Sequence, residues 1–239
     1  MQIAALTSEI GQQSKLAALG QMSALLAHEV RNPLAVMFQA YRQIRRRVGE
    51  QVDIEELMAI VEEEAWRLNH LVNDLVHFAG PIKPRLQAVG LGQVVQWALE
   101  GLMADPDVPT DKIVFHVDVA AELTPVLADP MLLRQAVSHL VSNACAHVKR
   151  GGEVRIAGEE DPSTDGIRLV VMNDGEPLPP DVARRVFEPF FTTKAKGTGL
   201  GLAVVRRLIE DQKGKVALDS TERGVSFSIW LPASSALSA

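Results

Sequence analysis

Apolar residues recur every three or four positions through most of the first 80 residues, and this spacing is the strongest constraint on how the chain folds. One series runs from Leu16 to Val48 and a second from Ile54 to Phe78. Such spacing is typical of amphipathic helices. The charged segment 45–51 between them indicates a turn, so the two helices form a hairpin. One hairpin leaves an apolar stripe uncovered, which a four-helix bundle of two hairpins would bury. We therefore expect a homodimer.

The pattern changes after the second helix. Segment 80–85 holds two prolines and a glycine, which is typical of a linker. Beyond it, the sequence predicts an α+β domain in which Asp129 caps a long helix that begins at Pro130. Its expected helices are 91–103, 130–148 and 203–211, and its expected strands are 113–119, 124–127, 154–158, 167–172, 215–220 and 224–231. The expected parts of the chain are an N-terminal helix at 1–15, the hairpin at 16–79, the linker at 80–85, the α+β domain at 86–232 and a flexible tail at 233–239.

Composition excludes several classes of protein. The chain has 24 Lys and Arg against 30 Asp and Glu, so its net charge is −6 and a basic nucleic-acid-binding surface is not expected. The single cysteine, Cys145, excludes an intrachain disulfide and a cysteine zinc cluster. No apolar run approaches the roughly 18–20 residues of a membrane-spanning helix. We expect a cytoplasmic protein without a membrane segment in this chain, although a longer parent chain could be membrane-anchored.

One histidine lies on the polar side of the first helix. His28 follows Leu26 by two residues, which rotates it about 200° from the apolar stripe. Asn32 lies one turn later on nearly the same face, and Glu29 flanks it. Pro33 removes a helical hydrogen bond, at a cost of about 3 kcal/mol in an ordinary helix interior. A solvated helix face with an incidental histidine is the simpler explanation of His28 alone, but its neighbours favour a site.

The string at 28–33, His-Glu-Val-Arg-Asn-Pro, resembles the H-box of two-component sensor histidine kinases. The resemblance implies that His28 is the phosphoacceptor and that Glu29 polarises its imidazole. It also implies that Asn32 orients water when the phosphorylated response regulator is dephosphorylated. A neutral imidazole suits the first role, because one nitrogen is nucleophilic while a carboxylate accepts the other ring proton.

A glycine-rich run precedes the last expected helix. The chain has no Walker-type phosphate loop, but the run 197–202 reads Gly-Thr-Gly-Leu-Gly-Leu. Backbone N–H groups at the start of a helix favour an anion such as phosphate. Taken alone, the run fits ordinary turn chemistry as well.

The context of this run resembles the ATP-binding domain of the same kinases, most closely those of the nitrogen-regulation type. The N, G1, F and G2 boxes correspond, in order, to Asp129-Pro130 with Gln135 and Asn143-Ala144, to Asn173-Asp174-Gly175, to 187–194 and to 197–202. The resemblance implies a two-layer α/β sandwich of the Bergerat type that binds ATP and Mg²⁺, with Asn143 as a ligand of the metal. The implied nucleotide-binding residues are His139, Asn143, Asn173, Gly175, Thr193, Lys194, Gly197, Thr198, Gly199, Leu200 and Gly201.

Three positions depart from the family pattern. Asn173 replaces the aspartate that accepts a hydrogen bond from the adenine amino group, and Pro177 replaces a glycine of the same box. Ala146 stands where many relatives carry lysine. An asparagine oxygen still accepts a hydrogen bond, but without charge assistance. Asp174 is the alternative if the strand register differs by one residue.

The sequence therefore predicts a histidine kinase core. It would phosphorylate His28 from Mg·ATP, pass the phosphoryl group to an aspartate in a response regulator receiver domain, and act as that regulator's phosphatase. The alternative is a non-catalytic phosphotransfer scaffold with a degraded nucleotide site. A chaperone-like or repair-type ATPase would leave the string at 28–33 unexplained.

Overall fold

The computed structural model describes residues 23–47, 54–79, 82–103, 112–149, 151–161, 164–194 and 197–237. The chain divides into two compact units, Met1–Pro81 and Ile82–Ala239. The expected N-terminal helix at 1–15 lies outside the described residues. Among the described residues, no helix has the length and apolar character needed to cross a membrane.

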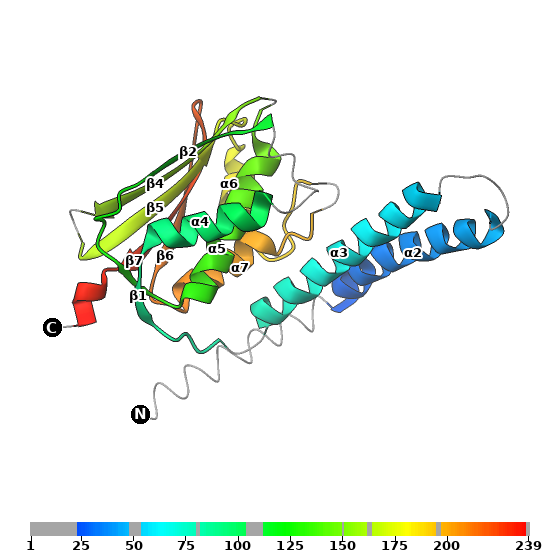
Figure 1. Ribbon diagram of the computed structural model, residues 1–239, viewed down its shortest axis with the longest axis horizontal. Coiled ribbons are helices and arrows are strands. Elements are labelled where there is room, and N and C mark those ends of the chain that lie inside the picture. Colours follow the sequence, from blue (N-terminus) through cyan, green and yellow to red (C-terminus); the bar gives the residue numbers. More distant parts are fainter. Residues whose placement is uncertain are drawn as a thin grey trace. The chain divides into compact units, whose positions relative to one another are not determined.

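The first unit is the expected helical hairpin (Figure 1). Helix α2 spans Ser23–Arg47 and packs along α3, which spans Ile54–Ala79. The helical periodicity of the sequence is confirmed here, including a proline within α2 at Pro33. The predicted beginning of the first helix, at Leu16, precedes the described residues.

Helix α2 carries two neighbouring apolar stripes. Pro33 and Ala40 are buried, with Met37 half-buried between them. The second stripe is exposed in the single chain, where Leu34, Phe38 and Tyr41 are 37%, 58% and 57% accessible. The spacing of both stripes is three or four residues, so each follows one side of the helix. The hairpin thus covers one apolar stripe and leaves the other open.

The second unit is a five-stranded sheet covered on one face by helices (Figure 1). The strand order is β2-β4-β5-β7-β6, in which β2 and β4 are parallel and the other neighbours are antiparallel. The strands are β2 Val114–Val119, β4 Glu153–Asp161, β5 Gly166–Asn173, β6 Lys215–Thr221 and β7 Gly224–Pro232. The helices are α4 Leu91–Met103, α5 Pro130–His147, α6 Pro180–Arg185 and α7 Gly201–Glu210.

Side chains on the inner face of the sheet form the core with α4, α5 and α7. In β7 the alternate residues Val225, Phe227, Ile229 and Leu231 are 5% accessible or less, as the period of two in the sequence predicts. The expected two-layer α/β sandwich is therefore confirmed.

Three features differ from the sequence expectations. A short strand, β1 at Gln87–Val89, pairs antiparallel with β3 at Val126–Ala128, and the sequence did not predict it. Helix α6 was also missed. The expected flexible tail begins with a buried Ala233, whose N–H donates to the Asp165 carbonyl at 3.1 Å, and continues as a 3₁₀ helix at Ser234–Leu237. This part of the tail is packed because its backbone is hydrogen-bonded, which an Ala/Ser composition does not reveal.

Candidate functional site

Helix α5 organises the candidate nucleotide site. Its sheet-facing residues, including Leu133, Leu140 and Ala144, are fully or almost fully buried. Another stripe, four residues apart, consists of His139, Asn143 and His147. Each of these three residues lies against a different segment of the second unit.

The beginning of α5 is fixed by Asp129. One carboxylate oxygen accepts from the backbone N–H groups of Met131 and Leu132 at 3.0 and 3.3 Å, and the other accepts from the Arg85 N–H at 2.8 Å. The predicted cap is confirmed, with Pro130 at the first helical position. Because the cap sets where the helix starts, it also sets the rotation at which His139 and Asn143 face the site.

At His139, helix α5 lies close to the first turn of α7. A Cβ atom placed on Gly201 would lie 3.5 Å from His139 Nδ1. Gly199, just before α7, has a φ of 67°, and its carbonyl accepts from the Phe190 N–H at 2.8 Å. The first N–H groups of a helix lack partners within the helix. The glycine run therefore brings backbone N–H groups that have no partner within α7 close to His139.

At Asn143, the helix contacts the loop that carries Lys194. Lys194 Nζ donates to Asn143 Oδ1 at 3.1 Å, and burial lowers the pKa of this lysine. Burial also lowers the pKa of the His147 imidazole, and the positive charge of Lys194 lowers it further. His147 is not among the site residues that the sequence predicts. Its spacing of four residues from Asn143 was the signal that could have placed it there.

At the end of α5, the His147 carbonyl lies against the turn after β5. Asn173 is 2% accessible, and its side-chain oxygen accepts from the Gly175 N–H at 2.9 Å. A Cβ on Gly175 would collide with the His147 carbonyl, so only glycine fits there. The carboxylate of Asp174 instead accepts from the Lys149 N–H at 3.3 Å.

Two threonines form local hydrogen bonds near the end of segment 187–194 and at the start of segment 197–202. Thr192 Oγ1 accepts from the Lys194 N–H at 3.1 Å, and Thr198 Oγ1 accepts from the Leu200 N–H at 3.3 Å. Sequence reasoning missed the role of Thr192. The neighbouring Thr193, a predicted nucleotide-binding residue, is exposed. Leu200 is fully buried and serves packing.

Cys145 is one of the buried residues of α5. It is 5% accessible, and burial raises its pKa to about 11. At neutral pH it is therefore a protonated thiol, which is a poor nucleophile.

The predicted phosphoacceptor lies on α2. The backbone of His28 and Glu29 is helical, and their side chains are outside the described part of the structure. Asn32 is exposed, and Pro33 is buried. The predicted polar cluster of these side chains therefore stays a prediction.

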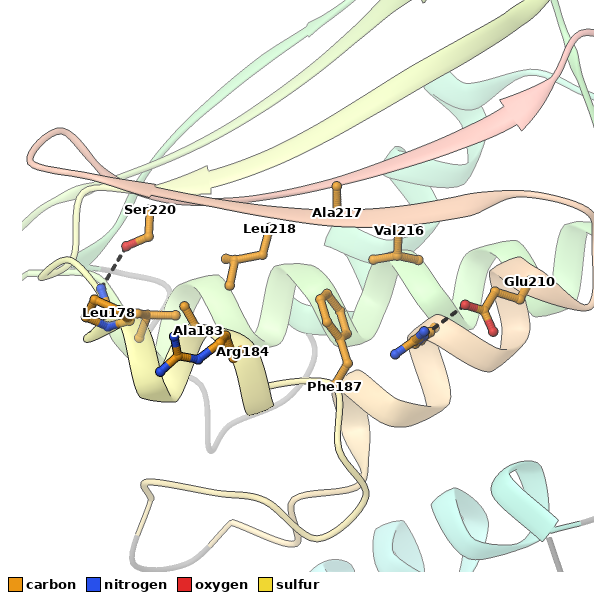
Figure 2. A pocket seen from close by; sticks show the side chains of 11 residues that line it. Leu178, Ala183, Arg184, Phe187, Glu210, Val216, Ala217, Leu218 and Ser220 are labelled. Carbon is orange, nitrogen blue, oxygen red and sulfur yellow. Dashed lines mark hydrogen bonds and ion pairs between the residues drawn. The ribbon is translucent and has the colours of Figure 1, made fainter. Parts of the chain in front are cut away.

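A separate groove lies between α6, α7 and the edge strand β6. Its volume is about 610 Å³, and none of the predicted nucleotide-binding residues lines it. Figure 2 shows the Phe187 ring pointing toward Val216 and Ala217 of β6, which also line this groove. The Phe187 ring also packs edge-on against Phe227, with centroids 6.0 Å apart. This contact holds Phe187 against the inner face of β7.

The described side chains fit a nucleotide with Mg²⁺. Asn143 Oδ1 accepts from a cation, the Lys194 ammonium, so this oxygen faces positive charge in the structure and has the chemistry of a Mg²⁺ ligand. Within the described residues there is no group of three or more His, Cys, Asp and Glu able to hold a metal alone. Mg²⁺ commonly uses few protein oxygens and completes its shell with waters and substrate phosphates.

Two family comparisons cover most of the chain. Residues 128–235 match the histidine kinase-, DNA gyrase B- and HSP90-like ATPases, and residues 18–80 match the phosphoacceptor domain of histidine kinases. The fold and the site thus define an ATPase domain of this class joined to a phosphoacceptor hairpin.

Relatives and solved structures agree with this class. The chain is 34% identical to the sensor histidine kinase ZraS of Salmonella typhi over 222 residues, which is 92% of this chain and 47% of the relative. It is 31% identical to the kinase AtoS of Escherichia coli, covering 93% of this chain and 36% of AtoS. The crystal structure of the histidine kinase ThkA in complex with the response regulator protein TrrA has a TM-score of 0.82 and 25% identity, covering 98% of this chain and 67% of that chain. The chain belongs to the sensor histidine kinase family, and it spans half or less of these curated relatives.

Proposed function

We propose that this chain is the catalytic core of a sensor histidine kinase that binds Mg·ATP and phosphorylates His28. The observation that carries this proposal is the convergence on α5. One helix face meets the α7 N-terminus at His139, the cationic loop at Asn143 and the turn of Asn173 at His147. The α7 N-terminus is suited to bind phosphates, Asn143 to bind a metal ion, and Asn173 to bind an adenine ring.

Each group has a task in binding. The backbone N–H groups that open α7 and the Lys194 ammonium bind phosphate oxygens, while Asn143 holds Mg²⁺. Asn173 accepts from the adenine amino group through its side-chain oxygen. When bound, Mg²⁺ neutralises the charge that develops on the phosphates during transfer.

The transfer step needs one group from each unit, His28 from the first and the bound ATP from the second. An imidazole nitrogen of His28 forms a bond to the γ-phosphorus as the bond to the bridging oxygen breaks, and ADP leaves. The carboxylate of Glu29 accepts the hydrogen bond of the other ring nitrogen and stabilises the cation that forms. Segment 80–85 acts as the linker, within which Pro84 and Pro81 limit the relative movement of the units.

The proposed partners are a second copy of the chain and a response regulator receiver domain. The exposed stripe of Leu34, Phe38 and Tyr41 supports a dimeric four-helix bundle. ThkA, whose fold this chain shares, was crystallised with a response regulator. An aspartate of the receiver domain then takes the phosphoryl group from His28, and Asn32 orients the water that later hydrolyses it.

Incubation with γ-labelled ATP and Mg²⁺ tests this function. We expect acid-labile, alkali-stable label on the wild type and none on His28→Gln. Asn32→Ala is expected to keep the label and to lose phosphatase activity toward the phosphorylated regulator. Equal loss of both activities in Asn32→Ala would contradict the division of roles. Label on His28→Gln would place the acceptor elsewhere.

One observation favours a second candidate, a phosphotransfer scaffold that does not bind ATP. Asn173 has no charge, and one lone pair of its oxygen is already used by Gly175. Isothermal titration with ADP distinguishes the candidates. A wild type that is folded but binds no nucleotide would favour the scaffold, whereas His28 would still accept a phosphoryl group from a phosphorylated regulator.

A further inference from the structure

The Lys194 ammonium contacts Asn143 Oδ1, which is the oxygen that the proposed function assigns to Mg²⁺. The Nζ–Oδ1 distance is 3.1 Å, and the Lys194 side chain is more than half enclosed by protein. We propose that Lys194 and Mg²⁺ are alternative cations at Asn143, so that Lys194 neutralises bound phosphates when the metal is missing. This inference rests on the proposed nucleotide site.

The loop backbone holds Lys194 in this position. Its N–H donates to Thr192 Oγ1, and its carbonyl accepts from the Gly197 N–H at 3.3 Å. A Cβ on Gly197 would lie 3.1 Å from the Lys194 Cβ, so the Gly197 backbone lies close to the lysine side chain. Beyond these contacts, the Phe190 N–H donates to the Gly199 carbonyl at 2.8 Å. The lysine is therefore anchored on both sides by hydrogen bonds.

Electrostatic repulsion prevents the Lys194 ammonium and Mg²⁺ from binding Asn143 Oδ1 at the same time. A lysine ammonium and a divalent ion that share a ligand atom would lie within a few ångströms of each other, and their repulsion is strong in a partly buried site. Mg²⁺ must displace Lys194 from Asn143, and the freed ammonium then remains close enough to bind a phosphate oxygen. Without Mg²⁺, the lysine supplies the positive charge for the phosphates from its present position.

A thermodynamic cycle tests the exchange without measuring catalysis. ADP affinity is measured by isothermal titration at constant ionic strength, with saturating Mg²⁺ and with chelator. The Mg²⁺ factor is the ADP affinity with Mg²⁺ divided by the ADP affinity with chelator. We expect this factor to be about tenfold larger in Lys194→Met than in the wild type, because in the variant Mg²⁺ does not have to break a charge-assisted hydrogen bond, whose free energy corresponds to about that factor. Lys112→Met is the charge-matched control, because Lys112 is exposed beside the edge strand β2. Its Mg²⁺ factor should equal that of the wild type.

The role of Asn143 is isolated in a second pair of variants. In an Asn143→Ala background, adding Lys194→Met should change the Mg²⁺ factor by less than twofold, because the shared ligand is gone. Circular dichroism and the thermal midpoint establish that each variant is folded. Equal Mg²⁺ factors in the wild type and in Lys194→Met would overturn the exchange while leaving nucleotide binding intact. If the folded wild type binds no ADP in either condition, both the proposed function and the exchange are wrong.

Discussion

The side-chain oxygen of Asn173 accepts a hydrogen bond from the Gly175 N–H at 2.9 Å, inside the turn that follows β5. This bond fixes the orientation of the amide, because the oxygen must point toward the donor. Asn173 is also held by its strand, where it pairs with Val154 on one side and Val225 on the other. An amide oxygen has two lone pairs, so one remains for a nucleobase amino group.

Replacing this asparagine by aspartate should strengthen nucleotide binding. In Asn173→Asp, the carboxylate keeps the bond to Gly175 and makes a charge-assisted bond to the adenine amino group. We expect the ADP dissociation constant to fall by a factor of about three to ten, as charge assistance adds roughly 1 kcal/mol. Isothermal titration with ADP measures this change. Asn173→Ala, which removes the acceptor, should weaken binding instead, and an unchanged affinity in both variants would show that adenine is recognised elsewhere.

The glycine before α7 is required by its backbone conformation. Gly199 has a φ of 67°, and a Cβ there would collide with the backbone of Phe190. Gly199→Ala should therefore cost at least about 1–2 kcal/mol in local strain. Because the strain falls on the turn that presents the α7 N-terminus, we expect ADP affinity to fall tenfold or more.

A matched glycine separates this effect from the general effect of adding a methyl group. Gly92 is exposed near the beginning of α4, and a Cβ there has no atom within 4 Å. Gly92→Ala should stabilise the domain by up to about 1 kcal/mol and leave ADP affinity unchanged. Thermal unfolding and titration of both variants check the pair. If Gly199→Ala bound ADP like the wild type, the turn would have no part in phosphate binding.

Much of the fold follows from periodicity in the sequence. The hairpin helices, α4 and most strands have clear apolar patterns, and the beginning of α5 is marked by the Asp129 cap. Strand β1 has only three residues and gains its stability from pairing with β3. Helix α6 is six residues long and has no buried residues. Strand β1 therefore depends on a tertiary contact that a local pattern does not carry, and α6 is too short to show an apolar period.

The sequence predicts part of the candidate site, because local motifs and helical spacing identify some of its residues. Motif order identified the boxes, and helical spacing linked His139 to Asn143. The hydrogen bond between Lys194 and Asn143 joins residues 51 positions apart, so no local pattern reveals it. The same holds for the contact of Gly175 with the His147 carbonyl. Loop closure, rather than periodicity, decides these contacts.

The exposed stripe on α2 leads to a prediction about assembly. Phe38 is 58% accessible in the single chain and lies between Leu34 and Tyr41. Phe38→Glu should weaken the dimer about 100-fold, since burying each phenylalanine contributes about 1.5 kcal/mol or more and a symmetric dimer contains two. Light scattering over a concentration series measures the change. Gln39→Glu, an exposed position on the same helix, is the control and should stay dimeric. A Phe38→Glu protein that dimerises like the wild type would place the interface elsewhere.

The Asp129 cap links stability to the nucleotide site. Its carboxylate accepts three backbone hydrogen bonds, two within α5 and one from Arg85. Asp129→Ala should destabilise the protein by about 1–2 kcal/mol, the range for loss of a helix cap, and lower the thermal midpoint by several degrees. Because the cap fixes the start of α5, frayed first turns should also weaken ADP binding, but less than Asn173→Ala does. Asp118→Ala, at an exposed position in β2, should change neither quantity. Thermal unfolding together with ADP titration measures both effects, and a normal midpoint in Asp129→Ala would show that Pro130 alone is enough to start the helix.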